Sequence, residues 1–174
     1  MLGIAIQRNY QMNRFMQNFS NVVKLPLPEK EKMDLNESLK VVIDSYSSVL
    51  KEKNITVDLD FDISSPVIHA DRSQMELVFS NIIKNSAEAV VRDGEIRVST
   101  LINPVSIHFE DNGTGLSKEI SEKIFTPFFS TKPGGQGIGL TLVQEILINH
   151  EFSFSFRNRE TTGTEFIVIC NNHN

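Results

Sequence analysis

Two clusters of glycine residues form the part of the sequence best suited to binding a ligand. They lie in the stretch Glu110–Thr141, which holds Gly113 and Gly115 and then Gly134, Gly135, Gly137 and Gly139. Glycine turns let the backbone approach a ligand closely, and their successive N–H groups can surround an anion. The second cluster runs directly into GLTLVQEILI, an apolar-periodic helix whose first amides would face the same ligand. The stretch predicts a nucleotide site with a glycine-rich phosphate lid, and a pair of flexible surface loops is the alternative.

A row of polar side chains on another predicted helix could supply the rest of such a site. Asn81, Asn85, Glu88 and Arg92 are spaced i, i+4, i+7 and i+11, so they lie in one row along the helix, with Lys84 beside them. Mg²⁺ prefers oxygen ligands and takes few of them from the protein, so an asparagine oxygen with phosphates and water would serve. The row therefore suits an ATP site built from a helix and glycine turns.

Asp111 stands at the end of a predicted strand, at the mouth of the first glycine cluster. Its carboxylate can accept a hydrogen bond from an exocyclic amine such as that of adenine. Thr164 or a neighbouring residue could support the same edge of the base through a water molecule. Asp111 is therefore the candidate for reading the base.

Other site types do not fit the sequence. A Rossmann site needs GxGxxG directly after a first strand, and a P-loop needs GxxxxGK followed by Ser or Thr; the glycine clusters here match neither. The histidines share no short zinc-ligand spacing, and the GxSxG of many hydrolases is absent. The single cysteine, Cys170, excludes an intramolecular disulfide and suits a reducing compartment.

The elements that must position these residues alternate along residues 34–174. Apolar periodicity predicts helices over 36–53, over 71–91 and after the second glycine cluster, with Asn36 capping the first and Asp71 forming a capping box with Gln74. Period-two alternation predicts strands over 55–62, 95–102, 104–110, 152–158 and 164–170, a short extended segment at 67–70, and a hairpin turn at TTGT. This order favours an α/β fold, a two-layer sandwich of one mixed sheet with helices on one face.

A helix and a linker are expected before that domain. Apolar residues repeat at three and four over residues 4–23, a stripe of about two heptads that requires a partner. Dimerisation through this helix is favoured over packing on the chain's own domain. Two prolines and alternating charge in KLPLPEKEK predict the linker. The chain therefore divides into a helix over 1–24, a linker over 25–33 and a domain over 34–174.

Composition limits the partners. The net charge of −5 and the pI of about 5.4 argue against nucleic acid and anionic membranes. The sequence has no run of about 18 apolar residues that would span a membrane. An ATP site would have to be locally basic, through Lys84, Arg92 and Lys132.

Five motifs, in order and with family spacing over roughly residues 34–170, resemble those of sensor histidine kinases. NIIKNSAEA resembles their N box, DNGTGL their G1 box, IFTPFFSTK their F box, GGQGIGL their G2 box and TGTEF the final motif. The resemblance implies the Bergerat ATP-binding fold, shared with gyrase, the heat-shock chaperone and mismatch-repair ATPases. The short lid is most similar to that of nitrogen-regulatory kinases.

The resemblance also implies roles for individual residues. Asn85 corresponds to the Mg²⁺ ligand and Asp111 to the adenine-reading aspartate, with Lys84 as a phosphate contact. Phe125 would anchor the lid through hydrophobic contact. Glu88 and Arg92 fit either a surface role or a functional one. The residues expected to surround the nucleotide are Asn85, Lys84, Glu88, Asp111, Gly113, Gly115, Leu116, Phe125, Thr131, Lys132, Gly135, Gln136, Gly137, Ile138, Gly139, Leu140 and Thr164.

Asn81 stands where hydrolysing relatives such as gyrase carry a glutamate that activates water. Because an amide cannot act as a general base, the resemblance favours transfer of the γ-phosphate over hydrolysis, with Asn81 and Asn85 at the catalytic centre. No histidine precedes His69, so the usual phospho-acceptor is missing, and residues 1–24 resemble the second helix of the dimerisation module.

The expected function is thus the ATP-binding domain of a cytoplasmic sensor histidine kinase, or the cytoplasmic part of a membrane-anchored one. The expected ligands are ATP or ADP with Mg²⁺, and the expected partners are a response regulator and a second copy of the kinase, with no nucleic acid. The alternatives are an anti-sigma-type serine kinase and a degenerate interaction domain that binds no nucleotide.

Overall fold

The structure of the chain is a computed structural model that describes residues 25–91, 93–132 and 135–171. The helix expected over residues 4–23, with its proposed dimer contact, lies outside the described residues, as do Arg92 and Gly134. No described helix combines the length and the apolar character needed to cross a membrane.

A five-stranded sheet carries most of the domain. Its strands lie in the order β2 (Thr56–Asp60), β4 (Glu95–Ile102), β5 (Val105–Asp111), β7 (Thr164–Ile169) and β6 (Ser153–Asn158). Strands β2 and β4 are parallel, whereas the remaining pairs are antiparallel. The predicted mixed sheet and its two hairpins are therefore confirmed.

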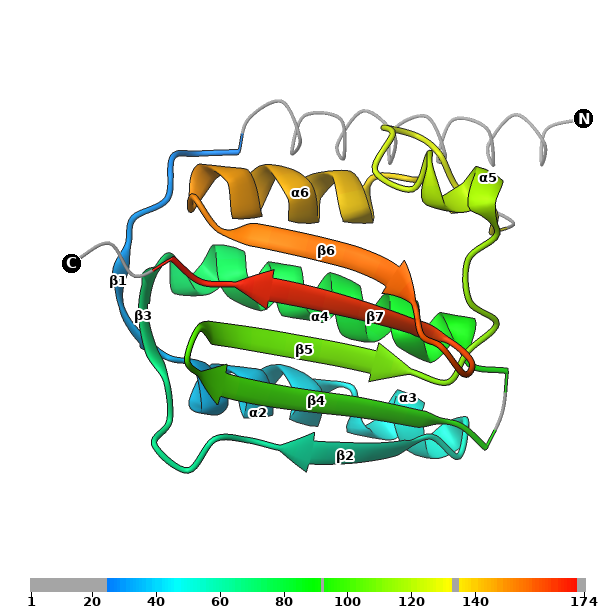
Figure 1. Cartoon of the computed structure of the whole chain (residues 1–174), viewed down its shortest axis with the longest axis horizontal. Helices are drawn as coiled ribbons and strands as arrows, with labels where there is room; N and C mark the ends of the chain where they lie inside the picture. The colour runs from blue at the N-terminus through cyan, green and yellow to red at the C-terminus, as the bar shows by residue number, and fades with distance from the viewer. Residues whose placement is uncertain (1–24, 92, 133–134, 172–174) are drawn as a thin grey trace, which may run out of the picture.

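The helices lie on one face of this sheet, as predicted. Helices α2 (Leu35–Ser45) and α4 (Arg72–Ala89) run behind the strands in Figure 1, with the short helix α3 (Ser47–Glu52) beside α2. Helix α6 (Gly139–Asn149) packs against α4 and lies next to β6 in the same view. The one-turn helix α5 (Lys118–Ser121) lies in the long connection between β5 and α6. In the part of the chain that the structure describes, no helix covers the other face of the sheet.

The core forms between the sheet and α4. Phe109 of β5 and Phe166 of β7 are almost fully buried, and the ring of Phe79 on α4 lies 6.0 Å from the ring of Phe109, centroid to centroid. Alternate residues of β4 follow the same rule, since Ile96 and Val98 are fully buried. Each such side chain contributes about 1.5–3 kcal/mol by leaving water. This contact fixes α4 over the strand that ends in Asp111.

The first helix differs from the prediction at its start. Asp34, not Asn36, is the N-cap, and its side chain accepts a hydrogen bond of 2.9 Å from the backbone N–H of Glu37. The Asn36 side chain is instead buried, where it donates to the Asp62 carbonyl and accepts from the Thr100 hydroxyl. Long-range partners therefore decided the role of Asn36.

The same helix is also broken, where one continuous helix over 36–53 was expected. Helix α2 ends at Ser45 and α3 begins at Ser47, on either side of Tyr46. The Ser45 hydroxyl donates to the Val42 carbonyl at 2.6 Å, a local bond that competes with the helical pattern. The Tyr46 hydroxyl lies 2.7 Å from the Ser80 hydroxyl on α4, which ties the break to the neighbouring helix.

A second, two-stranded sheet lies at one end of the domain. Strand β1 (Glu31–Asp34) pairs antiparallel with β3 (Val67–Ala70), and Met33 of β1 is fully buried. Residues 31–33 of β1 belong to the segment that we expected as a linker. The capping box is half formed, because Asp71 caps α4 through Gln74 N–H whereas the Gln74 amide donates to the Pro26 carbonyl.

Candidate nucleotide site

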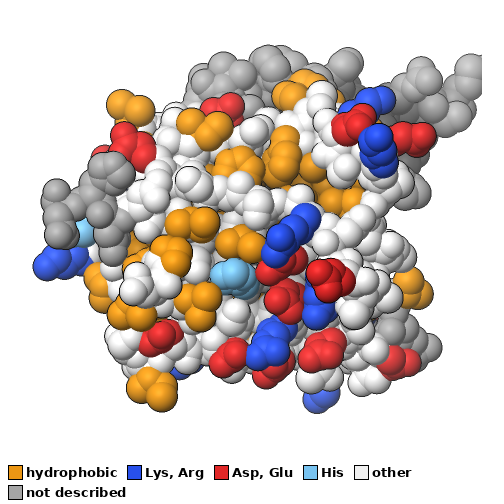
Figure 2. Space-filling model, viewed as in Figure 1, with side chains coloured by type: hydrophobic (Ala, Val, Ile, Leu, Met, Phe, Trp, Pro, Cys, Tyr) orange, Lys and Arg blue, Asp and Glu red, His pale blue; other side chains and the backbone are white. Residues whose placement is uncertain are grey.

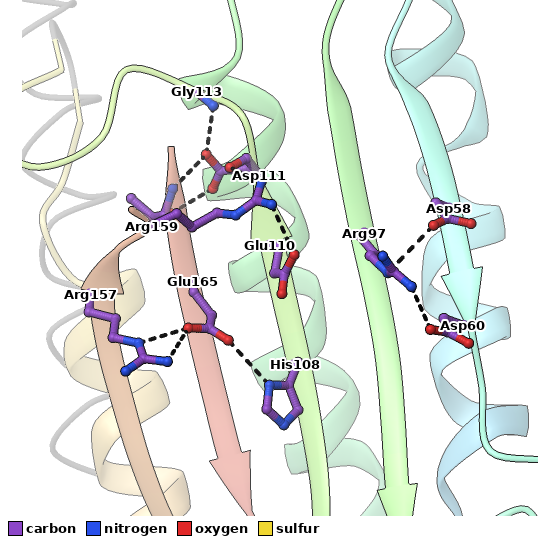
Figure 3. Close-up of polar contacts among 11 residues, drawn as sticks. Asp58, Asp60, Arg97, His108, Glu110, Asp111, Gly113, Arg157, Arg159 and Glu165 are labelled. Carbon is purple, nitrogen blue, oxygen red and sulfur yellow. Dashed lines mark hydrogen bonds and ion pairs between the residues drawn. The ribbon is translucent and has the colours of Figure 1, made fainter. Parts of the chain in front are cut away.

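Asp111, at the end of β5, is a buried carboxylate surrounded by hydrogen-bond donors. One carboxylate oxygen accepts the backbone N–H groups of Gly113 at 2.9 Å and Thr164 at 3.3 Å. The other accepts the Thr164 hydroxyl at 2.6 Å, and Asp111 is only 3% exposed. These bonds offset the cost of removing a carboxylate from water. Figure 3 shows the carboxylate with Gly113 above it and Arg159 beside it.

Thr164 therefore supports Asp111 directly, whereas the sequence suggested support of the base through water. Strand β7 begins at Thr164, and the turn before it brings the two residues together. Gly163 makes this possible: it has φ +84°, and a Cβ placed on it would lie 1.9 Å from the Asp111 carbonyl oxygen. Any larger residue would push β7 away from Asp111. The TGT sequence is thus a requirement of the site as well as a hairpin turn.

Helix α4 carries the predicted polar row towards the second glycine cluster. The Lys132 ammonium donates to the Asn85 side-chain oxygen at 3.3 Å and forms an ion pair with Glu88. Lys84 lies 4.0 Å from the same glutamate, one helical turn away. The structure therefore brings together Asn85, Lys84, Glu88 and Lys132, although the ion pairs are exposed and contribute little stability.

Asn81 lies where α4 meets the start of α6. Its side-chain amide donates to the Leu77 carbonyl at 2.8 Å. A Cβ on Gly139 would lie 2.7 Å from the Asn81 side-chain oxygen, so glycine lets the two helices approach here. Helix α6 begins after Ile138, and within the described residues its cap has no side-chain hydrogen bond. Its first N–H groups and its dipole are thus suited to an anion.

The segment between the glycine clusters packs on the edge of the sheet through Phe125. The Phe125 ring lies 5.4 Å from Phe154 and 6.4 Å from Phe156, both on β6. Its carbonyl accepts the Thr141 hydroxyl of α6 at 3.3 Å. The Phe128 N–H donates to the Gly137 carbonyl at 2.8 Å, which joins this segment to the second cluster. Phe125 therefore packs by hydrophobic contact, and its role as the anchor of a lid stays a prediction.

Of the remaining predicted residues, Gly115 and Leu116 lie in the turn after Asp111, and Gly115 has φ +73°. Thr131 and Gly135 are exposed, Gln136 and Leu140 are half-buried, and Ile138 is buried. They flank Lys132 or the start of α6.

A divalent cation fits the Asn85 oxygen, which already accepts a cationic ammonium group. Among the described residues no group of three or more His, Cys, Asp and Glu could hold a metal. Mg²⁺ bound to nucleotide needs only one or two protein oxygens, because phosphates and water supply the others. The donor set therefore suits nucleotide-bound Mg²⁺ better than a metal held by protein alone.

Two residues at the end of β6 belong to the site and were not found from the sequence. The Arg159 guanidinium donates to the Asp111 carbonyl at 3.4 Å and lies 3.3 Å from the Glu110 carboxylate. The Asn158 side chain makes two hydrogen bonds to the backbone of Leu116. The available signal was their position, a few residues before the TGT turn.

The open face of the sheet carries ion pairs that are separate from this site. Figure 2 shows basic and acidic side chains gathered together on this face. Arg97 lies 3.5 Å from Asp58 and also pairs with Asp60, and Glu165 contacts both Arg157 and His108 (Figure 3). Burial works to raise the pKa of Glu165, but hydrogen bonds from Arg157 and His108 outweigh it, so the pKa is lowered. Glu165 thus stays ionised on this face.

Comparison with known proteins relates this chain to a family of ATPases. Residues 70–173 match the family described as histidine kinase-, DNA gyrase B-, and HSP90-like ATPase. The sensor protein TdiS of Thauera aromatica is 30% identical over 173 residues, which cover 95% of this chain and 32% of TdiS. The chain thus spans about a third of that relative's length.

Solved structures agree. The catalytic domain of the histidine kinase ThkA superposes with a TM-score of 0.75 at 29% identity, covering 83% of this chain and 97% of that domain. The structure of ThkA in complex with the response regulator TrrA gives a TM-score of 0.77 at 24% identity, covering 95% of this chain and 48% of that one. The second likeness shows the shared fold.

Proposed function

Because the chain belongs to the histidine kinase-, DNA gyrase B-, and HSP90-like ATPase family, we propose that it is the ATP-binding catalytic domain of a sensor histidine kinase. The observation that carries the proposal is the buried Asp111 carboxylate, held by Gly113 and Thr164 at the end of β5. Among the described residues no ion pair involves this carboxylate, and it can accept more than the three hydrogen bonds that it receives here. The remaining acceptor capacity would take the hydrogen bond from the exocyclic amine of adenine.

The phosphates and Mg²⁺ would lie between α4 and α6. Asn85 supplies an oxygen to the metal, and Lys132, now beside Asn85 and Glu88, supplies positive charge to the phosphates. The start of α6 supplies N–H groups. Bound Mg²⁺ would neutralise charge that develops on the phosphates during transfer.

Transfer is favoured over hydrolysis because no described side chain beside the start of α6 offers a general base. Asn81 is an amide, and its donor group is engaged by the Leu77 carbonyl. The bond from the γ-phosphorus to ADP would break as a bond to an imidazole nitrogen forms, and ADP would leave. The acceptor histidine would lie on a dimerisation helix of the whole kinase.

The partners follow from the same proposal. A response regulator would take the phosphoryl group from the histidine, and the complex of ThkA with TrrA supports this class of partner. Residues 1–24 would join two copies of the kinase. The cytoplasm, which supplies ATP and Mg²⁺, is the proposed location.

The test has two parts. Calorimetry of the 174-residue chain with ADP should show binding that weakens when Mg²⁺ is removed. The whole kinase, incubated with γ-labelled ATP, should acquire label that is stable in alkali and lost in acid, as expected for phosphohistidine. Acid-stable label would indicate a serine kinase instead, and absence of nucleotide binding at millimolar concentration would indicate an interaction domain.

A further inference from the structure

The turn from Asn112 to Leu116 forms a wall of the proposed base site, and hydrogen bonds to several parts of the chain hold it, including one of 3.4 Å from the Thr114 N–H to the Ala89 carbonyl of α4. The Glu95 N–H donates to the Asn112 side chain at 2.9 Å, at the start of the turn. The Gly113 N–H donates to Asp111. The end of the turn is held by a side chain, because Leu116 is bound by a residue that lies 42 positions away in the sequence.

That side chain is Asn158, the last residue of β6. Its amide oxygen accepts the Leu116 N–H at 2.7 Å, and its amide nitrogen donates to the Leu116 carbonyl at 2.7 Å. This is the pair of bonds that a neighbouring strand would make, supplied by one side chain. The Asn158 oxygen also leaves little room at Gly115, which has φ +73° and where a Cβ would lie 3.1 Å from that oxygen.

The position of Asn158 links this bond to the rest of the site. Its partner across the β6–β7 ladder is Thr164, the residue that holds the Asp111 carboxylate. Phe156 and Phe154, two and four positions earlier in β6, lie on the same side of the strand and pack on Phe125. One side of the edge strand thus holds both the turn at Leu116 and the anchor of the lid segment.

We propose that Asn158 is a positioning residue for nucleotide binding: its paired hydrogen bonds to Leu116 fix the Gly113–Leu116 turn in the shape that receives adenine. The inference rests on the proposed function. Without the bonds, the turn would have to be ordered when ADP binds, and that cost would appear as lost affinity. In this proposal Asn158 acts through the backbone of Leu116 and does not contact the phosphates.

The experiment compares the chain with Asn158→Ala, Asn158→Asp and the control Ser155→Ala. Ser155 lies exposed on the same strand, and its side chain has no hydrogen bond among the described residues. Calorimetry with ADP and Mg²⁺, well below the unfolding temperature, should show about tenfold weaker binding for Asn158→Ala, equal to ~1.4 kcal/mol. Asn158→Asp should bind ADP no better than Asn158→Ala does, because one of its carboxylate oxygens would face the Leu116 carbonyl. Ser155→Ala should bind normally.

Amide hydrogen exchange separates positioning from general stability. In Asn158→Ala the Leu116 amide should exchange faster, whereas the amides of β5 should keep their protection. Unchanged ADP affinity in Asn158→Ala, full affinity in Asn158→Asp, or unchanged exchange at Leu116 would each overturn the proposal. If the unsubstituted chain itself fails to bind ADP, the proposed function and this role both fall, and the exchange result then reports only on the turn.

Discussion

Asp111→Asn tests the base site with a nearly isosteric change. The oxygen that accepts the Gly113 and Thr164 N–H groups can remain an oxygen in asparagine. The oxygen that accepts the Thr164 hydroxyl becomes an NH₂ group, and the hydroxyl can rotate to accept from it. The fold should therefore survive, while the site gains a donor where adenine also presents one.

The magnitude follows from these bonds. In the variant, a neutral bond between the new side-chain amide and Thr164 replaces a charge-assisted one, which should lower the free energy of unfolding by about 1 kcal/mol. Binding should suffer more, because a buried amine left without an acceptor costs about 1–3 kcal/mol. That range corresponds to a loss of roughly fivefold to 150-fold in ADP affinity.

Calorimetry with ADP and Mg²⁺, together with urea unfolding of both proteins, checks these values. Thr164→Val is the matched control, since it removes the hydroxyl but leaves the carboxylate to accept from adenine. It should destabilise the fold by about 1–2 kcal/mol and weaken ADP less than Asp111→Asn does. Wild-type affinity in a folded Asp111→Asn protein would refute the assignment of the base site.

Three further predictions concern other parts of the domain. Asn81→Glu supplies a general base and should raise steady-state ATP hydrolysis at least about tenfold, measured as released phosphate, whereas Asn81→Ala should not; equal rates would contradict the transfer argument. Lys132→Met should lower the affinity for ADP several-fold but leave the affinity for adenosine unchanged. The free energy of unfolding should also stay unchanged, because the ion pair of Lys132 with Glu88 is exposed. An equal loss of affinity for adenosine would exclude a contact between Lys132 and the phosphates. Burial lowers the pKa of His150, whose neutral ring accepts a hydrogen bond from the Asp71 N–H. The free energy of unfolding in urea should therefore be full above about pH 6.5 and should fall as the pH drops below that value. A His150→Gln variant should lose less stability over the same pH range, and a pH profile identical to that of the unsubstituted chain would contradict the prediction.

The helices and strands with regular apolar spacing were predictable because the spacing of apolar residues within each segment indicates which of its faces is buried. Helix α4, helix α6 and the hairpins β4–β5 and β6–β7 occur where apolar spacing placed them. Strand β2 shows the limit of that rule, because it lies at an edge of the sheet and Leu59 is 42% exposed despite the alternation. Alternation predicts a strand, but the position of the strand in the sheet decides how much of it is buried.

Side chains with distant partners were not predictable in the same way. Asn36 is of a residue type that often caps helices, yet its side-chain amide forms hydrogen bonds with Asp62 and Thr100, which are 26 and 64 residues away. The exchange is favourable because a buried amide with both groups satisfied costs little, and Asp34 can cap the helix in its place. Both side chains are of types that can cap a helix, so the sequence pattern alone did not reveal that tertiary contacts would select Asp34 over the predicted Asn36.

The same distinction divides the nucleotide site. Asp111, Gly113 and Gly139 could be named from the sequence because each is constrained by its own chemistry, as an acceptor or as a residue without a Cβ. Asn158 could not be named from the sequence, because its contribution is a pair of hydrogen bonds to the backbone of Leu116. Several types of side chain can donate and accept hydrogen bonds, so the residue type alone does not reveal this role. A motif search finds the residues that face the ligand. The residues that hold those residues in place emerge only when the end of β6 is seen beside the turn that follows β5.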